Sequence, residues 1–177
     1  FDLYGDYRYD GRRKSKFNGL AGRHVHTYHD RKSFSKNFIA AWQSGKRFVV
    51  AYEPIFDESL AEGDLWKARR AEANWWGRLM WDAGDGNREL HLPIEEYAKL
   101  SETAGKDKSI IGEIATGGRK FGLIMYPIFQ RTQEVPKTLM TSAPRKIIGG
   151  LESVKDAKSL ADELDVSVDA LIKVSKL

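Results

Sequence analysis

Two adjacent carboxylates follow an apolar run in a position that suits phosphoryl-transfer chemistry. The run is Leu90–Ile94, and Glu95 and Glu96 come directly after it. If the run is a buried strand, both carboxylates stand at its carboxyl end, where open α/β sheets bind their ligands. Glu95 could hold Mg²⁺ there while Glu96 orients and deprotonates an attacking water. The helix dipole and capping also favour two glutamates at the start of a helix, so a purely structural role stays open.

A second set of polar residues flanks the most continuous apolar run of the chain, Phe121–Phe129. Gln130, at the carboxyl tip of that run, could hydrogen-bond a γ-phosphate or the attacking water. Arg119 and Arg131 could supply positive charge to the transition state, in a neighbouring subunit if the protein forms a ring. Alternatively, Arg119 and Lys120 are solvated side chains beside the end of a helix.

Basic side chains concentrate in the first 40 residues and suggest contact with nucleic acid. This stretch has nine Lys or Arg residues against four Asp or Glu, whereas the whole chain has a net charge of +4. Such a cluster can neutralise phosphates and adds sequence-independent affinity. The candidate DNA-binding residues are Arg12, Arg13, Lys14, Lys16, Arg31 and Lys32. The alternative is a solvated basic loop without a partner.

These side chains need strands to position them, and strand-like and helix-like runs alternate along the chain. Strand patterns cover residues 47–52, 90–94, 121–129 and 146–148, and residues 1–7 resemble the end of a strand. Helical patterns cover 34–42, 57–82 and 109–116, begin again at Pro136, and return at 153–164 and 167–175. This alternation predicts an α/β protein, a three-layer sandwich with a mostly parallel central sheet. We expect one domain over residues 1–177, with residues 151–177 as a C-terminal helical extension.

The order of these motifs resembles the ATPase core of the FtsK/HerA-type DNA-pumping motors. The shared order is an acidic pair after a strand, a helix, GRKFG at 118–122, a second strand, and QRTQEVPKTL at 130–139. The resemblance covers residues 86–150 and implies a RecA-like P-loop NTPase core that uses ATP and Mg²⁺ to translocate or package DNA. It assigns water activation to Glu96, a place beside Mg²⁺ to Glu95 and γ-phosphate sensing to Gln130. It also implies a homo-oligomeric ring, typically a hexamer, with a virion portal or a membrane-associated packaging complex as partner.

The chain departs from that family's pattern at three places. It has Glu95-Glu96 where the family usually has Asp-Glu, and Gln-Arg-Thr at 130–132 where the family usually has Thr-Gln-Arg-Pro. It also lacks the phosphate-binding loop G-x-x-x-x-G-K-[ST], because Gly45-Lys46 is followed by Arg47 and Gly105-Lys106 by Asp107. We expect the first strand, this loop and its helix to precede Phe1 in the natural protein. The alternative is a homologue that has lost nucleotide binding.

Composition restricts the other classes of site and location. The chain has no cysteine, which excludes disulfides and thiolate metal sites, and His24, His26 and His29 have no recognisable further zinc ligand. No apolar run approaches the roughly 20 residues of a membrane span, and the first residues show no signal-peptide pattern. We therefore expect a cytoplasmic or virion-associated protein that is not secreted.

Two other functions stay open. One is a non-hydrolysing DNA-binding or assembly protein that keeps the fold without the phosphate-binding loop and works through its basic first 40 residues. The other is a transcription regulator built on the last two helices. These helices resemble a helix-turn-helix, but residues 167–177 offer only Lys173 and Lys176 as basic side chains.

Overall fold

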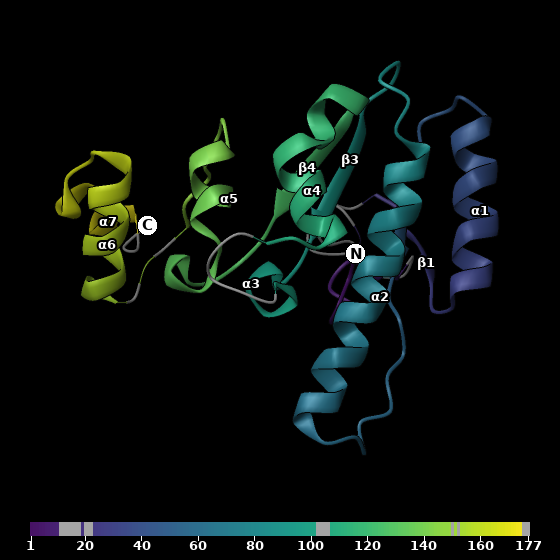
Figure 1. Ribbon diagram of the computed structural model, residues 1–177, viewed down its shortest axis with the longest axis horizontal. Coiled ribbons are helices and arrows are strands. Elements are labelled where there is room, and N and C mark those ends of the chain that lie inside the picture. The colour runs from purple at the N-terminus through teal and green to yellow at the C-terminus, as the bar shows by residue number, and fades with distance from the viewer. Residues whose placement is uncertain (11–18, 20–22, 102–106, 150, 152, 175–177) are drawn as a thin grey trace.

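The computed structural model describes residues 1–10, 19, 23–101, 107–149, 151 and 153–174 (Figure 1). Within this part of the chain the strands are β1 (His26–Tyr28), β2 (Val50–Tyr52), β3 (Leu90–Ile94) and β4 (Leu123–Pro127). The α-helices are α1 (Arg31–Gln43), α2 (Glu62–Ala83), α3 (Tyr97–Leu100), α4 (Ile110–Gly117), α5 (Lys137–Ser142), α6 (Val154–Leu164) and α7 (Val168–Val174). Two short 3₁₀ helices, η1 (Gly118–Phe121) and η2 (Thr132–Glu134), flank β4.

The four strands form two separate parallel pairs. β1 pairs with β2, with His26 opposite Val50, and β3 pairs with β4, with Leu90 opposite Leu123. The expected three-layer sandwich with one mostly parallel central sheet, and the RecA-like core that the resemblance implied, are therefore wrong. The described residues form two two-stranded sheets, and helices make up most of their regular structure. Alternation of strands and helices along the chain predicts parallel pairing, but it does not determine how many strands join one sheet.

Residues 1–3 lie between the two sheets and hydrogen-bond to both. The Phe1 nitrogen donates to the Pro93 carbonyl at 2.7 Å, and the Glu95 amide donates back to the Phe1 carbonyl at 3.4 Å. On the other side the Asp2 amide donates to the Tyr52 carbonyl at 2.9 Å. These backbone contacts fix the ends of β2 and β3 relative to one another.

The core forms where helices cover these strands. α2 buries Ala73, Trp76, Gly77 and Met80, whose spacing places them on one helical face. α4 lies against that face so closely that a Cβ at Gly77 would stand 2.7 Å from the Ile111 side chain. At the other side of α2, α1 contributes Phe34 and Phe38, which are buried together with Tyr52 of β2. Figure 1 shows α1 and α2 at one end of the molecule and α6 and α7 at the other.

Two further differences from the expected elements concern short strands. The expected strand at 146–148 does not form, and Ile147 is 97% exposed, because no strand in the described part of the chain pairs with this segment. Conversely, β1 occupies a segment whose sequence is polar and basic. Its pairing with β2 stabilises it, and apolar alternation contributes little.

The expected helices at the C-terminus form as α6 and α7. α6 buries Ala157, Leu160 and Ala161, and Leu171 of α7 is buried with them. The Ser153 side chain caps α6 at its start, and the Gln133 side chain before α5 donates to Asp156 at 3.3 Å.

Gly122 provides a test of the pairing between β3 and β4. It has φ of 80°, and a Cβ there would stand 2.3 Å from the Arg88 carbonyl oxygen, which is backbone and cannot move aside. We expect Gly122→Ala to lower the free energy of unfolding by about 2 kcal/mol or more. Gly117→Ala is the matched control, since a Cβ there meets nothing within 4 Å, and it should change stability by roughly 0.5 kcal/mol or less. Equal urea midpoints for the two variants would contradict this account of the turn.

Candidate functional site

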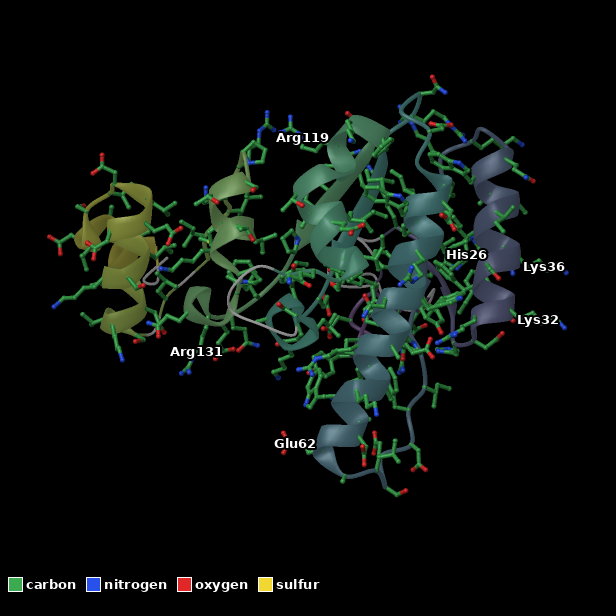
Figure 2. The ribbon with its side chains drawn as sticks, viewed as in Figure 1. His26, Lys32, Lys36, Glu62, Arg119 and Arg131 are labelled. Atoms are coloured by element: carbon green, nitrogen blue, oxygen red, sulfur yellow. The ribbon has the colours of Figure 1, made fainter. Side chains whose placement is uncertain are left out.

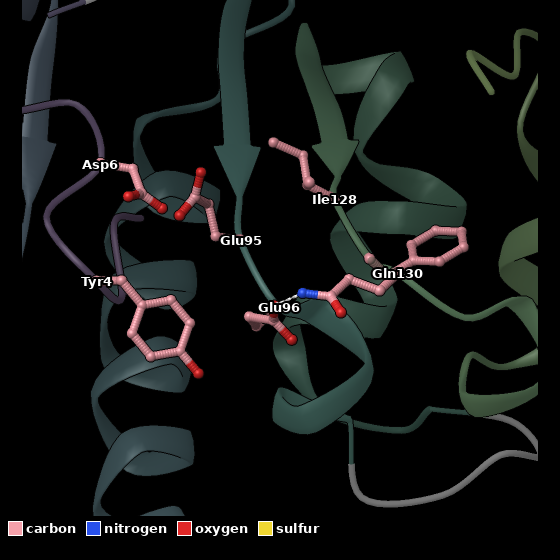
Figure 3. Close-up of a pocket in the computed structure, with 7 residues that line it drawn as sticks. Tyr4, Asp6, Glu95, Glu96, Ile128 and Gln130 are labelled. Atoms are coloured by element: carbon pink, nitrogen blue, oxygen red, sulfur yellow. Dashed lines mark hydrogen bonds between the residues drawn. The ribbon is translucent and has the colours of Figure 1, made fainter. Parts of the chain in front are cut away.

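A cavity of about 210 Å³ lies at the carboxyl ends of β3 and β4 (Figure 3). Three segments line it: the turn after residues 1–3, the residues after β3 and the residues after β4. Its lining residues are Tyr4, Asp6, Glu95, Glu96, Ile128, Phe129 and Gln130. Because the two strands are parallel, the segments that leave them do so at the same edge of the sheet.

Backbone hydrogen bonds continue beyond the ends of the two strands and hold these segments together. The Ile128 amide donates to the Ile94 carbonyl at 2.9 Å, and the Tyr97 amide donates to the Ile128 carbonyl at 3.0 Å. Glu96 stands between these two bonds, with φ of 48° and ψ of 40° in the left-handed region. A non-glycine residue in this region costs about 1 kcal/mol, so the surrounding contacts must hold Glu96 in place.

The Glu96 side chain meets the side chain of Gln130. The Gln130 Nε2 donates to the Glu96 Oε1 at 3.0 Å, as the dashed line in Figure 3 shows, and the Lys99 Nζ lies 3.7 Å from the Glu96 Oε2. The structure thus brings together two of the sequence-predicted catalytic residues. An acidic side chain and an amide in contact at a cavity can together orient a water molecule and accept its proton.

Glu95 has a strongly perturbed acidity. The pKa of Glu95 is raised to about 7, chiefly by burial and also by the nearby Asp6 and Asp2 carboxyls, while the Tyr7 hydroxyl opposes the rise by donating to the carboxylate. Figure 3 shows the carboxyl groups of Asp6 and Glu95 facing each other. The Asp6 carboxyl is therefore placed to raise the pKa of Glu95.

Asp2 shapes the turn that delivers Asp6 and Tyr7 to Glu95. Its carboxylate accepts hydrogen bonds from the backbone amides of Gly5 at 2.8 Å, Asp6 at 3.0 Å and Tyr7 at 3.1 Å, and the residue is 1% exposed. Gly5 has φ of 75°, which the turn requires. Sequence reasoning missed Asp2, Asp6 and Tyr7 as site residues. An Asp followed three positions later by Gly is the pattern of a side-chain-bonded turn and could have indicated them.

Glu53, the carboxylate that follows β2, is paired with Arg8. The Arg8 guanidinium binds Glu53 through two hydrogen bonds, one of them from Nε to Oε2 at 2.9 Å. The acidic residues that line the cavity are Asp6, Glu95 and Glu96.

The described residues hold no group of three or more His, Asp or Glu side chains arranged to bind a metal ion. The predicted Mg²⁺ beside Glu95 would thus take its remaining ligands from water and from the phosphates of a substrate, as Mg²⁺ commonly does. Among the histidines, the His24 and His26 rings lie 4.2 Å apart, and the His29 Nδ1 lies 2.9 Å from the Glu53 carbonyl oxygen.

The two arginines predicted to act in catalysis lie outside the cavity. Arg119 is in η1, before β4, and so at the opposite end of that strand from Gln130; Figure 2 shows it far from Arg131. Arg131 follows Gln130, but its side chain is exposed and lies 3.7 Å from Glu134.

The predicted DNA-binding residues are only partly described. Arg12, Arg13, Lys14 and Lys16 lie outside the described residues. Arg31 donates through Nε and Nη2 to the Glu72 carboxylate, both at 3.0 Å, so its charge is already paired. Lys32 is exposed on α1, with Lys36 one turn further along the helix (Figure 2).

The acidity of Glu95 can be tested with two variants that act in opposite directions. Asp6→Asn removes a negative neighbour and should lower the pKa of Glu95 by roughly one unit, whereas Tyr7→Phe removes a donor to the carboxylate and should raise it. Carboxyl-carbon NMR titration of the folded protein measures both.

The same raised pKa affects stability. Because the folded protein holds this proton more tightly than the unfolded chain, the contribution of Glu95 to stability is complete below pH 4.5 and is lost as the pH rises through about 7. Glu95→Gln should therefore stabilise the protein at pH 8, by about 1 kcal/mol after allowance for solvent screening, and Glu58→Gln, at an exposed position, is the control.

An unchanged Glu95 titration in both Asp6→Asn and Tyr7→Phe would show that the three groups do not interact.

Comparisons with known proteins link the chain to a bacteriophage. No protein-family model and no solved structure gives a significant match. Over 74 residues the chain is 35% identical to Protein P9 of Pseudoalteromonas phage PM2, a stretch that covers 42% of this chain and 34% of that protein. The match therefore spans about a third of the length of Protein P9. Among the described residues, none of the helices combines the length and the apolar character needed to cross a bilayer. The chain is similar to part of a phage protein.

Proposed function

We propose that this chain provides the water-activating part of an ATP-hydrolysing site in a bacteriophage motor that translocates or packages DNA. The observation that carries the proposal is the hydrogen bond from Gln130 to Glu96 at the shared carboxyl edge of two parallel strands. The similarity to a phage protein and the resemblance of residues 86–150 to DNA-pumping ATPases support it.

The two side chains have complementary parts in this chemistry. Glu96 accepts a proton from a water molecule as the water oxygen attacks the γ-phosphorus, and ADP leaves with the bridging oxygen. An amide group has two N–H donors and a carbonyl acceptor, so Gln130 can bond Glu96 and still contact the water or a γ-phosphate oxygen. In this way the position of Glu96 becomes sensitive to whether a γ-phosphate is present.

Glu95 and Asp6 give the site its dependence on pH and on Mg²⁺. Mg²⁺ bound with the nucleotide would supply charge neutralisation for the phosphates. Glu95 must lose the proton that it holds up to about pH 7 before its carboxylate can act as a ligand. We therefore assign Glu95, with Asp6 beside it, to the cation side of the cavity and Glu96 to the water side.

The proposal assigns no phosphate-binding loop to these residues. The 177 residues contain no G-x-x-x-x-G-K-[ST], so the β- and γ-phosphates would be bound by groups that do not belong to such a loop. A ring of subunits would also give the exposed Arg119 and Arg131 a role, since an arginine outside its own cavity can reach the site of a neighbour. DNA would contact the basic residues Arg12, Arg13, Lys14, Lys16 and Lys32, with Arg31 contributing less because of its pairing with Glu72.

The direct test is Mg²⁺-dependent ATP turnover, with and without DNA, by the protein expressed from its complete reading frame. Glu96→Gln should lower kcat by about 100-fold or more, because an amide cannot accept the proton, while ATP binding stays within about threefold of wild type. Gln130→Ala should lower kcat by a smaller factor, since it removes orientation but not the base.

Glu62→Gln is the matched control, because Glu62 is an exposed glutamate at the far end of α2 (Figure 2) and should leave turnover unchanged. Wild-type turnover with an unaffected Glu96→Gln variant would remove Glu96 from the mechanism. If the wild-type protein shows no turnover under any of these conditions, the non-hydrolysing DNA-binding or assembly protein becomes the better description.

A further inference from the structure

Arg69 of α2 stacks on aromatic rings and has a donor that no residue in the described part of the chain accepts from. Its guanidinium carbon lies 4.4 Å from the centre of the Trp66 ring, 5.7 Å from that of Phe56 and 6.0 Å from that of Tyr4. Its Nε is buried and has no hydrogen-bond partner within the described part of the chain. Three aromatic rings therefore hold this guanidinium, and its Nε donates to none of the described residues.

Other arginines that stack on aromatic rings in this protein also bind an oxygen atom. Arg31 lies 5.2 Å from the Trp75 ring centre and donates to both carboxylate oxygens of Glu72. Arg88 lies 3.8 Å from the Trp42 ring centre and donates through Nη2 to the Trp42 carbonyl oxygen at 2.8 Å. A charged donor left unpaired in a partly buried position costs free energy, so the missing oxygen partner of Arg69 needs an explanation.

Arg69 lies next to the cavity at the carboxyl ends of β3 and β4, because it contacts a residue that lines this cavity. Tyr4, one of the rings that contact it, also lines the cavity, and Figure 3 shows that ring beside Glu96. Trp66, the ring nearest to Arg69, is also connected to Glu96 through Lys99. The Lys99 Nζ lies 5.4 Å from the Trp66 ring centre and 3.7 Å from the Glu96 carboxylate.

The cavity itself lacks the charge that an anionic ligand requires. Its lining includes the carboxyl groups of Asp6, Glu95 and Glu96 but no Lys or Arg. Phosphates that approach these carboxyl groups are repelled unless cations stand nearby. Arg69 lies against the cavity-lining Tyr4 and has an Nε that no described residue accepts from, whereas Lys99 already faces Glu96.

We propose that Arg69 binds a phosphate group of the ligand that occupies this cavity. This inference rests on the proposed function in taking that ligand to be ATP. A phosphate of the DNA backbone offers the same oxygen chemistry, and the planar guanidinium suits either source because it can donate two parallel hydrogen bonds to one phosphate.

The test measures binding of ATP, of inorganic tripolyphosphate and of a short DNA duplex to the complete protein by calorimetry. Arg69→Met keeps an unbranched side chain against the rings without the charge, and it should weaken ATP and tripolyphosphate binding by roughly tenfold or more. Arg69→Lys keeps the charge without the two-pronged geometry and should give a smaller loss. Arg88→Met is the matched control, because Arg88 also stacks on a tryptophan, Trp42, which does not line the cavity, whereas Tyr4 beside Arg69 does; its affinities should stay near those of wild type.

A second measurement uses the unaltered protein and so does not depend on the folding of a variant. Phenylglyoxal modifies arginines, and saturating tripolyphosphate should slow modification at Arg69, as followed by mass spectrometry, more than at Arg88. If folded Arg69→Met binds ATP and tripolyphosphate as tightly as wild type, or if the bound anion gives no protection, Arg69 is not the phosphate contact.

The two proposals fail in different ways. An Arg69-dependent affinity for DNA alone would keep the phosphate contact and remove ATP from the cavity. ATP turnover that survives Arg69→Met at wild-type affinity would keep the proposed function and remove Arg69. Absence of binding to all three probes by the wild-type protein would contradict both.

Discussion

The parallel pairing of β3 with β4 determines the geometry of the cavity. The register, with Leu90 opposite Leu123, brings both strand ends to one edge of the sheet. Backbone hydrogen bonds that join Ile94, Ile128 and Tyr97 continue the pairing beyond these ends. Glu96 can then hold an unfavourable backbone conformation with its carboxylate against Gln130. Residues 1–3 hydrogen-bond to both sheets and so hold the turn that follows them next to Glu95. That turn contributes Tyr4 and Asp6 to the lining of the cavity. The pKa of Glu95 is raised because this arrangement buries its carboxyl group and places the Asp6 and Asp2 carboxyls nearby.

Much of the local structure can be predicted from the sequence, and the assembly of the strands cannot. The strand at 90–94, the apolar run that contains β4, and the helices α1, α2, α4, α6 and α7 follow from apolar spacing and from caps such as Ser109 and Ser153. β1 has no such pattern, and the apolar pair Ile147-Ile148 has a strand-like composition without a neighbour to pair with. Composition alone does not specify pairing partners, so a three-layer sandwich is the wrong inference even where single elements are predicted correctly.

Some residues of the candidate site can likewise be predicted from the sequence, and others cannot. Glu96 and Gln130 can be identified from the sequence because each closely follows an apolar run that forms a parallel strand. The position of Arg119 was also open to inference, since a residue before a strand lies at the end opposite to a residue after it. Asp6 and Arg69 could not be found in this way. Asp6 acts on Glu95, and Arg69 contacts the Tyr4 and Phe56 rings; both sets of contacts join residues that are distant in the sequence.

The most direct test of the account is a structure of the complete protein with Mg²⁺ and a non-hydrolysable ATP analogue. We expect the γ-phosphate within hydrogen-bond distance of the Gln130 amide, with a water molecule between it and the Glu96 carboxylate. Nucleotide bound elsewhere on the protein, with the Glu96–Gln130 pair unchanged and out of its reach, would contradict the assignment of this cavity as the site of hydrolysis.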